Sequence, residues 1–399
     1  MSTFANATLT RSPRLLSIDF LRGLVMFIMA LDHVRDFIHR DSFLYDPLDP
    51  AKTTVILYIT RWITHFCAPT FVLLSGVAAY LYGRQRPKKE LSFFLFTRGL
   101  WLVLVDLVIV SFSWGFNPPP HYSLFAVVAV IGAAMMVLSV LIYLPKTWIL
   151  WFGLILIFFH NCLDPLQKTG FNSFGWALLH KFSSFIWGNH YIIQVGYPLI
   201  PWTGVLALGY YMGTLFEPGY DPWKRKKILS TAGISAIVLF FILRFFNIYG
   251  DPSVYKPGET FTESLMIFFR VLKYPPSLLY LLITLGPVLI LLSRLKDDGI
   301  SPSNPLVIFG RVPLFYYVIH LYFIHLIAVV VALSSGHPFS DMVADTFIVN
   351  NKKLAGTYGL SLFWVYVIWI LLVIALYPLC RWYADFKSRH RNWRWLSYF

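Results

Sequence analysis

One apolar segment near the start of the chain carries the ionisable side chains Asp19, Arg22, Asp32, His33 and Asp36. Ionisable groups inside a bilayer cost free energy unless they are paired, and by default they mark functional sites. At about 100° per residue, Arg22 and His33 fall within about 20° of one another on a helix. Asp19 and Asp36 extend the same stripe by one turn at each end. We expect this face to line a protein interior or an aqueous cavity.

For Asp19 and Arg22, at the N-terminal end of this stripe, a functional and a purely structural role both remain open. Asp19 and Arg22 have the i,i+3 spacing of an ion pair, which could do no more than stabilise a helix bundle. His33 beside Asp32 favours a functional role, because buried histidines commonly handle protons.

A second apolar segment carries Arg61 and His65 at i,i+4, followed by Pro69. The depth of His65 is close to that expected for His33, so the two histidines could share a cavity. Alternatively, His65 only bonds across to another helix. Asp106, in the third apolar segment, is a candidate charge partner for Arg61.

The ninth apolar segment carries Arg311, His320 and His325. The two histidines lie about 140° apart around a helix, so they cannot both face one site. We prefer His320 for function and interpret His325 as a hydrogen-bonded core histidine. Trp202, at the start of the sixth segment, suits either a pocket wall or an interfacial anchor.

The elements that must position these residues are membrane helices. Of the 399 residues, 57% are hydrophobic and 13% charged, and the mean hydropathy is +0.64. Soluble domains are closer to one quarter charged. A spanning helix needs about 20 mostly apolar residues. The fold class is therefore all-α, a polytopic membrane bundle of about ten helices, near 17–38, 55–82, 93–113, 122–143, 147–162, 196–216, 228–246, 276–294, 304–333 and 359–380.

The basic residues predict the orientation of the bundle. With both termini in the cytoplasm, the basic runs 84–89, 224–227 and 387–394 all lie inside. The inside segments together hold 20 Lys and Arg against 6 Asp and Glu, a balance equal to the net charge of +14. Nucleic acid is then not needed as a partner. We expect a single membrane domain over residues 1–399, with short cytoplasmic tails at 1–16 and 381–399. The first apolar segment lacks a cleavage site and should remain as a helix.

Metal chemistry is not expected from this sequence. The three cysteines, Cys67, Cys162 and Cys380, are far apart and show no metal-ligand spacing. There is no metalloprotease helix motif and no phosphate-binding glycine loop. We expect three free thiols and no metal.

Several stretches resemble a known group of membrane enzymes. The stretch RLLSIDFLRGLVMFIMALDHVRDF (14–37) resembles the first core helix of the transmembrane acyltransferase superfamily. Its Arg22-X10-His33 spacing is similar to the signature of the acyltransferase-3 branch. The stretches at 61–81, 197–213 and 309–326 resemble bacterial relatives of heparan-α-glucosaminide N-acetyltransferase. The resemblance covers about residues 14–330.

The resemblance implies an activity. Such enzymes take acetyl-CoA from the cytoplasm and pass the acyl group to an acceptor on the far side, using a membrane-embedded histidine as general base or acyl carrier. By this resemblance His33 is the catalytic candidate, with Arg22 and Asp32 in support and Asp32 fixing its tautomer. A neutral imidazole, with a pKa of about 6.5, can take a proton from an amine or hydroxyl that attacks a thioester.

Further residues are expected around this centre. In the lysosomal heparan-α-glucosaminide N-acetyltransferase, the active histidine is placed just beyond the first core helix. This resemblance makes His39 a second candidate. The supporting or acyl-CoA pocket is expected to include Asp19, Asp36, His39, Arg61, His65, Trp202, Arg311 and His320. The CoA phosphates are expected to meet Arg84, Arg86, Lys88 and Lys89.

The expected partners are membrane lipid and an extracytoplasmic acceptor, namely an amino sugar, a glycan or a lipid headgroup. A homodimer is compatible with the sequence. The only glycosylation sequon, at Asn6, falls in the predicted cytoplasmic tail. This position fits a bacterial inner-membrane protein better than a lysosomal one. Two alternatives remain: a proton-coupled secondary transporter, because intramembrane His, Asp and Arg also form proton relays, and a non-catalytic partner in envelope assembly. N- and O-acylation, and direct transfer and an acyl-histidine intermediate, are equally open.

Overall fold

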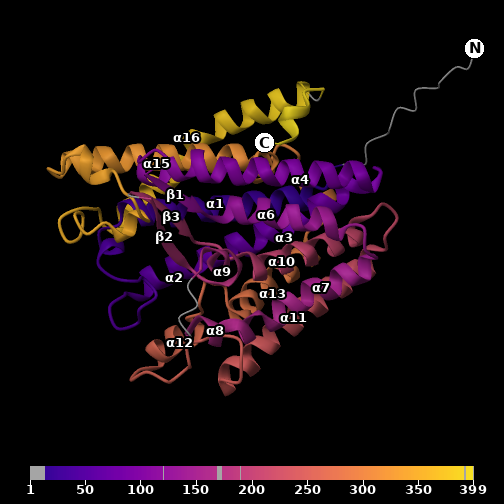
Figure 1. Ribbon diagram of the computed structural model, residues 1–399, viewed down its shortest axis with the longest axis horizontal. Helices are drawn as coiled ribbons and strands as arrows, with labels where there is room; N and C mark the ends of the chain where they lie inside the picture. The colour runs from indigo at the N-terminus through magenta and orange to yellow at the C-terminus, as the bar shows by residue number, and fades with distance from the viewer. Residues whose placement is uncertain (1–13, 120, 169–172, 189, 391, 399) are drawn as a thin grey trace, which may run out of the picture.

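The computed structural model describes all residues except 1–13, 120, 169–172, 189, 391 and 399. Long helices run side by side along the long axis of the molecule (Figure 1). Each of the ten predicted apolar segments is largely helical. The α-helices are α1 (Leu16–Ile38), α2 (Val55–Ile63), α3 (Cys67–Gly83), α4 (Lys88–Val105), α5 (Ser111–Gly115), α6 (Val127–Leu141), α7 (Lys146–Phe159), α8 (Asp164–Lys168), α9 (Phe174–His180), α10 (Leu199–Met212), α11 (Pro222–Phe246), α12 (Phe261–Phe269), α13 (Leu278–Arg294), α14 (Pro305–Arg311), α15 (Pro313–Ser334) and α16 (Leu362–Arg389).

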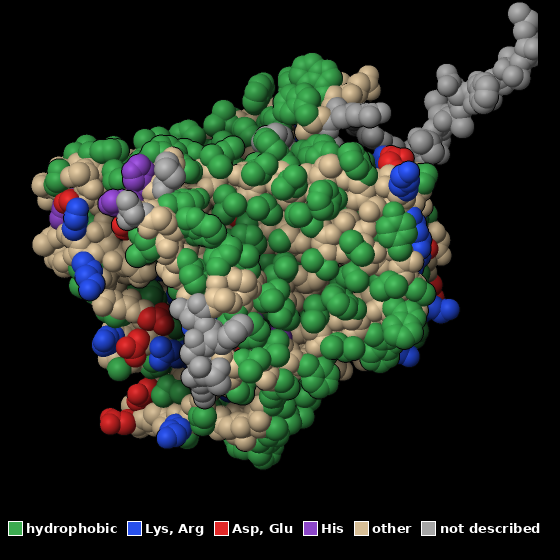
Figure 2. All heavy atoms as spheres, viewed as in Figure 1, with side chains coloured by type: hydrophobic (Ala, Val, Ile, Leu, Met, Phe, Trp, Pro, Cys, Tyr) green, Lys and Arg blue, Asp and Glu red, His purple; other side chains and the backbone are tan. Residues whose placement is uncertain are grey.

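The bundle has the surface of a membrane protein. Among the described residues, seven helical segments are long and apolar enough to span a bilayer, and α6 and α13 are shorter apolar helices. Helix α1 has the length of a span but carries the charges of the polar stripe. Figure 2 shows hydrophobic side chains over the face between the two ends, with charged side chains gathered at those ends. The prediction of a polytopic helical membrane bundle is confirmed.

Three of the predicted helices are interrupted in the structure. The segment 304–333 breaks at Val312, and Pro313 starts α15. The segment 55–82 contains a 3₁₀ turn, Thr64–Phe66, between α2 and α3. The third segment passes through a π-helical stretch, Asp106–Val110, between α4 and α5. At the other end of the chain, α16 continues to Arg389, so the first half of the predicted tail at 381–399 is helical.

A small sheet lies at the end of the bundle where α1 finishes, and the all-α prediction did not include it. Strand β1 (Tyr122–Phe125) pairs in parallel with β3 (Tyr191–Val195), which pairs antiparallel with β2 (Ser183–Trp187). Strand β1 replaces the first turn of the helix predicted at 122–143. The chain then enters α6 directly from the sheet.

Helix α1 is the structural centre of the bundle, in contact with α3, α14, α15 and α16. Two glycines allow its backbone to touch that of α14. A Cβ atom added to Gly23 would lie 1.8 Å from the carbonyl oxygen of Leu306, and one added to Gly310 would lie 1.8 Å from that of Asp19. This close contact fixes the rotation of α1, and with it the direction of the polar stripe.

Candidate functional site

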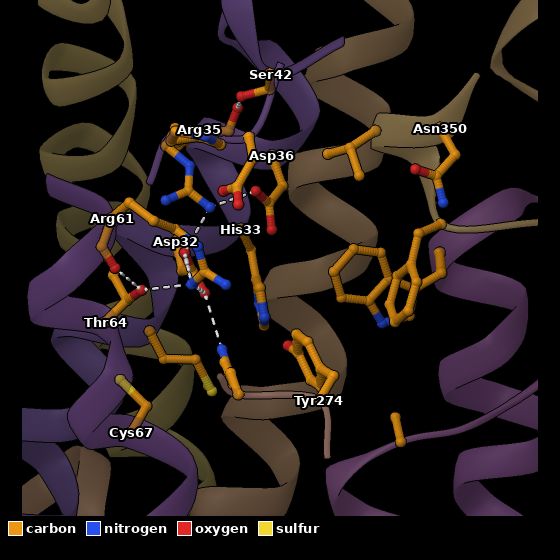
Figure 3. A pocket seen from close by; sticks show the side chains of 18 of the residues that line it. Asp32, His33, Arg35, Asp36, Ser42, Arg61, Thr64, Cys67, Tyr274 and Asn350 are labelled. Carbon is orange, nitrogen blue, oxygen red and sulfur yellow. Dashed lines mark hydrogen bonds and ion pairs between the residues drawn. The ribbon is translucent and has the colours of Figure 1, made fainter. Parts of the chain in front are cut away.

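The last two turns of α1 line a cavity of about 690 Å³, which we call the outer cavity. Its walls come from α1, the loop 42–47, the α2–α3 junction, β1, Tyr197, the loop around Tyr274 and residues 347–352. Figure 3 shows His33 extending into it, with Asp32 and Arg61 on one side and Tyr274 on the other. Its lining combines the charged groups around Asp32 with other polar, aromatic and aliphatic side chains, as suits a small polar substrate.

Three cations converge on one carboxylate in this cavity. Arg61 Nη1 lies 3.1 Å and Arg35 Nη2 2.7 Å from Asp32 Oδ1, and Lys273 Nζ lies 3.8 Å from Oδ2. Arg35 also forms an ion pair with Asp36. Because Asp32 is 7% exposed and Arg35 1%, these charges are largely removed from water. Breaking such a buried network leaves an unpaired charge, which is strongly destabilising.

His33 is joined to His320 on α15. The Nδ1 atom of His33 lies 2.7 Å from Nε2 of His320, and Nδ1 of His320 lies 2.9 Å from the carbonyl oxygen of Tyr316. A carbonyl can only accept, so Nδ1 of a neutral His320 carries the proton and its Nε2 accepts. His33 must then donate from Nδ1, which leaves the lone pair on its own Nε2.

That lone pair faces the cavity. His33 is 8% exposed and lines the outer cavity, and within the described part of the chain its Nε2 has no hydrogen-bond partner. Trp114 and Tyr317 enclose the ring, with centroids at 5.2 and 6.1 Å. A fixed tautomer with a free basic nitrogen in a polar cavity is the arrangement required of a general base or a nucleophile.

The expected role of Asp32 is therefore wrong in one respect: His320, and not Asp32, orients His33. Neighbouring residues on a helix point about 100° apart and do not face each other. Asp32 is instead held by the three cations. Asp106 also has a different partner from the one expected, because it accepts hydrogen bonds from the backbone N–H groups of Ala126 and Ala129 at the start of α6.

His65 does not share the cavity with His33. Its Nδ1 lies 3.0 Å from the carbonyl oxygen of Trp62, and its ring lies 5.4 Å from that of Tyr280. The 3₁₀ turn Thr64–Phe66 explains the difference, since three residues per turn cancel the i,i+4 alignment with Arg61. Arg61 and Thr64 face the cavity instead.

Three other candidates lie outside the cavity lining. His39 is buried beyond the end of α1, with Nε2 4.0 Å from Asp41, and burial lowers its pKa to about 4. Trp202 is fully buried behind Tyr197, whose ring lines the cavity. His325, interpreted as a core histidine, has both ring nitrogens within 3.1 Å of backbone carbonyl oxygens.

A second, smaller cavity of about 250 Å³ lies at the other end of α1, and we call it the inner cavity. Five cationic side chains line it: Arg14, Arg22, Arg98, Arg311 and Lys387. The carboxylate of Asp19 contacts Arg14 at 2.6 Å and Arg22 at 3.2 Å. Arg22 also donates to the carbonyl oxygen of Gly310 at 3.0 Å. The structure therefore places Asp19, Arg22 and Arg311 together, about 16 Å along α1 from His33.

The four basic residues expected to contact the CoA phosphates lie outside the inner cavity. None of Arg84, Arg86, Lys88 and Lys89 lines the inner cavity. Arg86 reaches its rim, with the guanidinium 3.8 Å from the ring of Tyr82, which does line it. Lys88 and Lys89 are exposed to solvent.

The two cavities share the same helices, one above the other. Phe71 and Ser75 lie one turn apart on α3, as do Val127 and Ile131 on α6 and Tyr317 and Pro313 on α15; the first of each pair lines the outer cavity and the second the inner one. Residues four apart on a helix lie on one face. One side of these helices thus leads from the inner cavity toward the outer cavity.

Reasoning from the sequence alone did not identify several residues of the two cavities. Arg35 could have been found, because it lies one turn from Asp32. Arg98 sits inside a predicted span, which is itself a signal. Lys273 comes from a loop between α12 and α13, and no local pattern marks it.

The chain was also compared with known proteins. The sequence model of one family, described as "Heparan-alpha-glucosaminide N-acetyltransferase, catalytic", matches residues 14–245, which is more than half of the chain. The match includes α1 and the α2–α3 junction, which supply much of the outer cavity. No curated protein matches the chain.

Proposed function

Because the chain belongs to the heparan-α-glucosaminide N-acetyltransferase catalytic family, we propose that it moves an acetyl group across the membrane from cytoplasmic acetyl-CoA to an extracytoplasmic acceptor. The family indicates a membrane acetyltransferase. The donor, the direction and the acceptor are our proposal. The observation that carries it is the pair of aligned cavities, one cationic and one containing His33.

The inner cavity suits the phosphate end of the donor. Its five cations face the side predicted to be cytoplasmic, where acetyl-CoA is made available. Arginine and lysine are the usual phosphate-binding side chains. In this assignment Arg22 contributes to the phosphate site and not to the chemistry at His33.

The distance between the cavities suits the rest of the donor. About 12 bonds separate the pantetheine oxygen from the sulfur, and at about 1.2 Å per bond they reach about 15 Å when extended. The rise along α1 between Arg22 and His33 is about 16 Å. A CoA molecule with its phosphates at the inner cavity would therefore place its thioester near His33.

The proposed reaction is acyl transfer assisted by His33. The acceptor amine or hydroxyl attacks the thioester carbonyl, His33 Nε2 takes its proton, the new C–N or C–O bond forms, and the C–S bond breaks to release CoA. Arg61, Arg35 and Lys273 supply positive charge near the developing oxyanion. The same lone pair would also serve an acyl-histidine route, which ping-pong kinetics would reveal.

The acceptor site is the outer part of the outer cavity. Asp36, Tyr45, Asp46 and Asn350 provide hydrogen-bonding groups there, beside the aromatic side chains of Phe43 and Phe347. This mixture suits an amino sugar, a glycan or a polar lipid headgroup. The family match and the polar lining support this class of acceptor.

Binding of acetyl-CoA to the detergent-purified protein tests this proposal. We expect saturable thermal stabilisation by acetyl-CoA, and none by S-acetyl-N-acetylcysteamine, which lacks the phosphates. Replacing Arg98 or Lys387 by Gln should weaken binding about tenfold each, since charge-assisted hydrogen bonds are involved. The matched control is Lys89→Gln, on the exposed surface. Equal affinity in all four proteins would contradict the assignment of the inner cavity.

A further inference from the structure

A third hollow, separate from both cavities, lies between the helix pairs α7–α10 and α11–α13, which Figure 1 shows together on one side of the bundle. Its volume is about 540 Å³. Its lining is almost entirely apolar, with Leu154, Leu208, Leu239 and Leu285 among the side chains. Helices α7 and α11 are peripheral spans, with only 28% and 22% of their apolar windows buried. The hollow is thus a groove in the lipid-facing part of the protein, and we call it the lateral groove.

The lateral groove has the dimensions of a hydrocarbon chain. On α11 it extends from Ile228 to Leu239, a rise of about 16 Å. At about 1.2 Å per bond, this length holds about 13 bonds of an extended chain. Small side chains make the space, because Ala232, Ser235 and Ala236 lie in the middle of the α11 wall, between Leu229 and Leu239. An acyl chain lying there would restore the dispersion contacts that an empty groove lacks.

One end of the lateral groove is polar and positively charged. Thr214 and Tyr220 line this end. The basic run 224–227 opens α11 beside them. Arg225 lies one turn before Leu229 and so on the groove face of the helix, with its guanidinium carbon 5.2 Å from the ring of Phe216.

The nearby carboxylates are already engaged. Asp221 accepts a hydrogen bond from the backbone N–H of Trp223 and caps α11. Glu217 lies 3.6 Å from Lys146 and accepts from Tyr80. The end of the groove therefore presents net positive charge at the level where phospholipid headgroups of the predicted cytoplasmic leaflet lie. Basic residues at this level attract anionic lipids, by about 1 kcal/mol each.

We propose that the lateral groove binds an anionic phospholipid, with one acyl chain along α11 and the phosphate at Arg225. The apolar length and the cationic end are both required: a neutral lipid would use only the first, and inorganic phosphate only the second. This site does not depend on the acyl-transfer reaction, because its residues are distinct from those of both cavities.

Native mass spectrometry of the purified full-length chain tests the proposal. The protein is mixed with equal amounts of dioleoylphosphatidylglycerol and dioleoylphosphatidylcholine in detergent. We expect one phosphatidylglycerol to remain bound, and its retention should exceed that of phosphatidylcholine by about fivefold or more for each basic residue that contacts the phosphate. Equal retention of the two lipids would overturn the proposal, as would a protein dimer whose formation covers the groove and excludes lipid.

Two matched pairs of variants locate the lipid. Ala236→Phe fills the groove, whereas Val238→Phe adds the same ring on the exposed face of the same helix. Arg225→Gln removes the charge on the groove face, whereas Lys226→Gln removes one that points about 100° away. Only the first of each pair should lose bound phosphatidylglycerol.

The outcome stays decisive if the larger substitution misfolds. Ser235→Leu fills less space at the same wall, and size-exclusion chromatography shows whether each variant is monodisperse. Equal loss of phosphatidylglycerol in Arg225→Gln and Lys226→Gln would mean that general surface charge, and not this groove, attracts the lipid. That result would overturn the site.

Discussion

At the level of single residues, the chemistry of His33 depends on a hydrogen bond from another helix. His320 accepts from Nδ1 of His33 because its own Nδ1 is committed to the carbonyl oxygen of Tyr316. The chain of bonds leaves one basic nitrogen in the outer cavity. His320 is thus a positioning residue, since it does not itself line that cavity.

Substitution of His320 separates orientation from packing. His320→Gln keeps a carbonyl that can accept from His33, so we expect it to retain much of the kcat, whereas His320→Phe removes the acceptor and should lower kcat about 10²-fold. KM for both substrates should change little in either variant. Steady-state kinetics measure this split, and equal activity of the two variants would argue against the tautomer assignment.

The sequence alone predicted part of this residue-level picture. The spacing in α1 identified the polar stripe, and His33, His320, Asp32 and Arg61 do meet in the structure. The pairing of His33 with His320 joins residues 287 positions apart, and a helical periodicity carries no information on which distant face it will meet. Lys273 escaped for the same reason, since a loop delivers it.

At the level of elements, short departures from ideal helix decide which side chains reach the cavities. The 3₁₀ turn at Thr64–Phe66 turns His65 away, and the break at Val312 separates α14 from α15. Helix periodicity assumes 3.6 residues per turn throughout, so it misplaced His65. It also could not show that the ends of a single stripe, Arg22 and His33, belong to two different cavities.

The contact between α1 and α14 gives an element-level prediction. Gly310→Ala places a methyl group against the backbone of Asp19, and we expect the free energy of unfolding to fall by about 1–3 kcal/mol, as overpacking costs elsewhere. Thermal unfolding in detergent measures this loss. The control is Gly175→Ala in α9, where an added Cβ meets nothing within 4 Å. Equal stability of the two variants would mean that α1 and α14 are not held in backbone contact.

At the level of the whole molecule, the composition predicted the membrane bundle, because apolar length and low charge leave few alternatives. The sequence does not predict the three-stranded sheet at one end, since its strands are only four or five residues long and fall in stretches predicted to be helix and loop. The orientation rests on the distribution of lysine and arginine and remains a prediction.

Cysteine labelling tests that orientation. In a background with Cys67→Ala, Cys162→Ser and Cys380→Ala, we expect Lys226→Cys to react with a membrane-impermeant maleimide only from the cytoplasmic side, and Lys352→Cys only from the opposite side. Both lysines are exposed. Residue 226 belongs to the basic run 224–227, which should lie on the cytoplasmic side. The opposite labelling pattern would place this run outside and so reverse the proposed direction of acetyl transfer.

The most direct test of the central claim follows the acetyl group itself. Proteoliposomes carry acetyl-CoA labelled in the acetyl group on the cytoplasmic face of the protein and glucosamine on the other face. We predict labelled N-acetylglucosamine on the face that holds the glucosamine, at a rate that His33→Ala abolishes and that His121→Gln, on the exposed surface, leaves unchanged. Undiminished transfer in His33→Ala, or proton-coupled uptake of the amino sugar without any need for acetyl-CoA, would contradict the account.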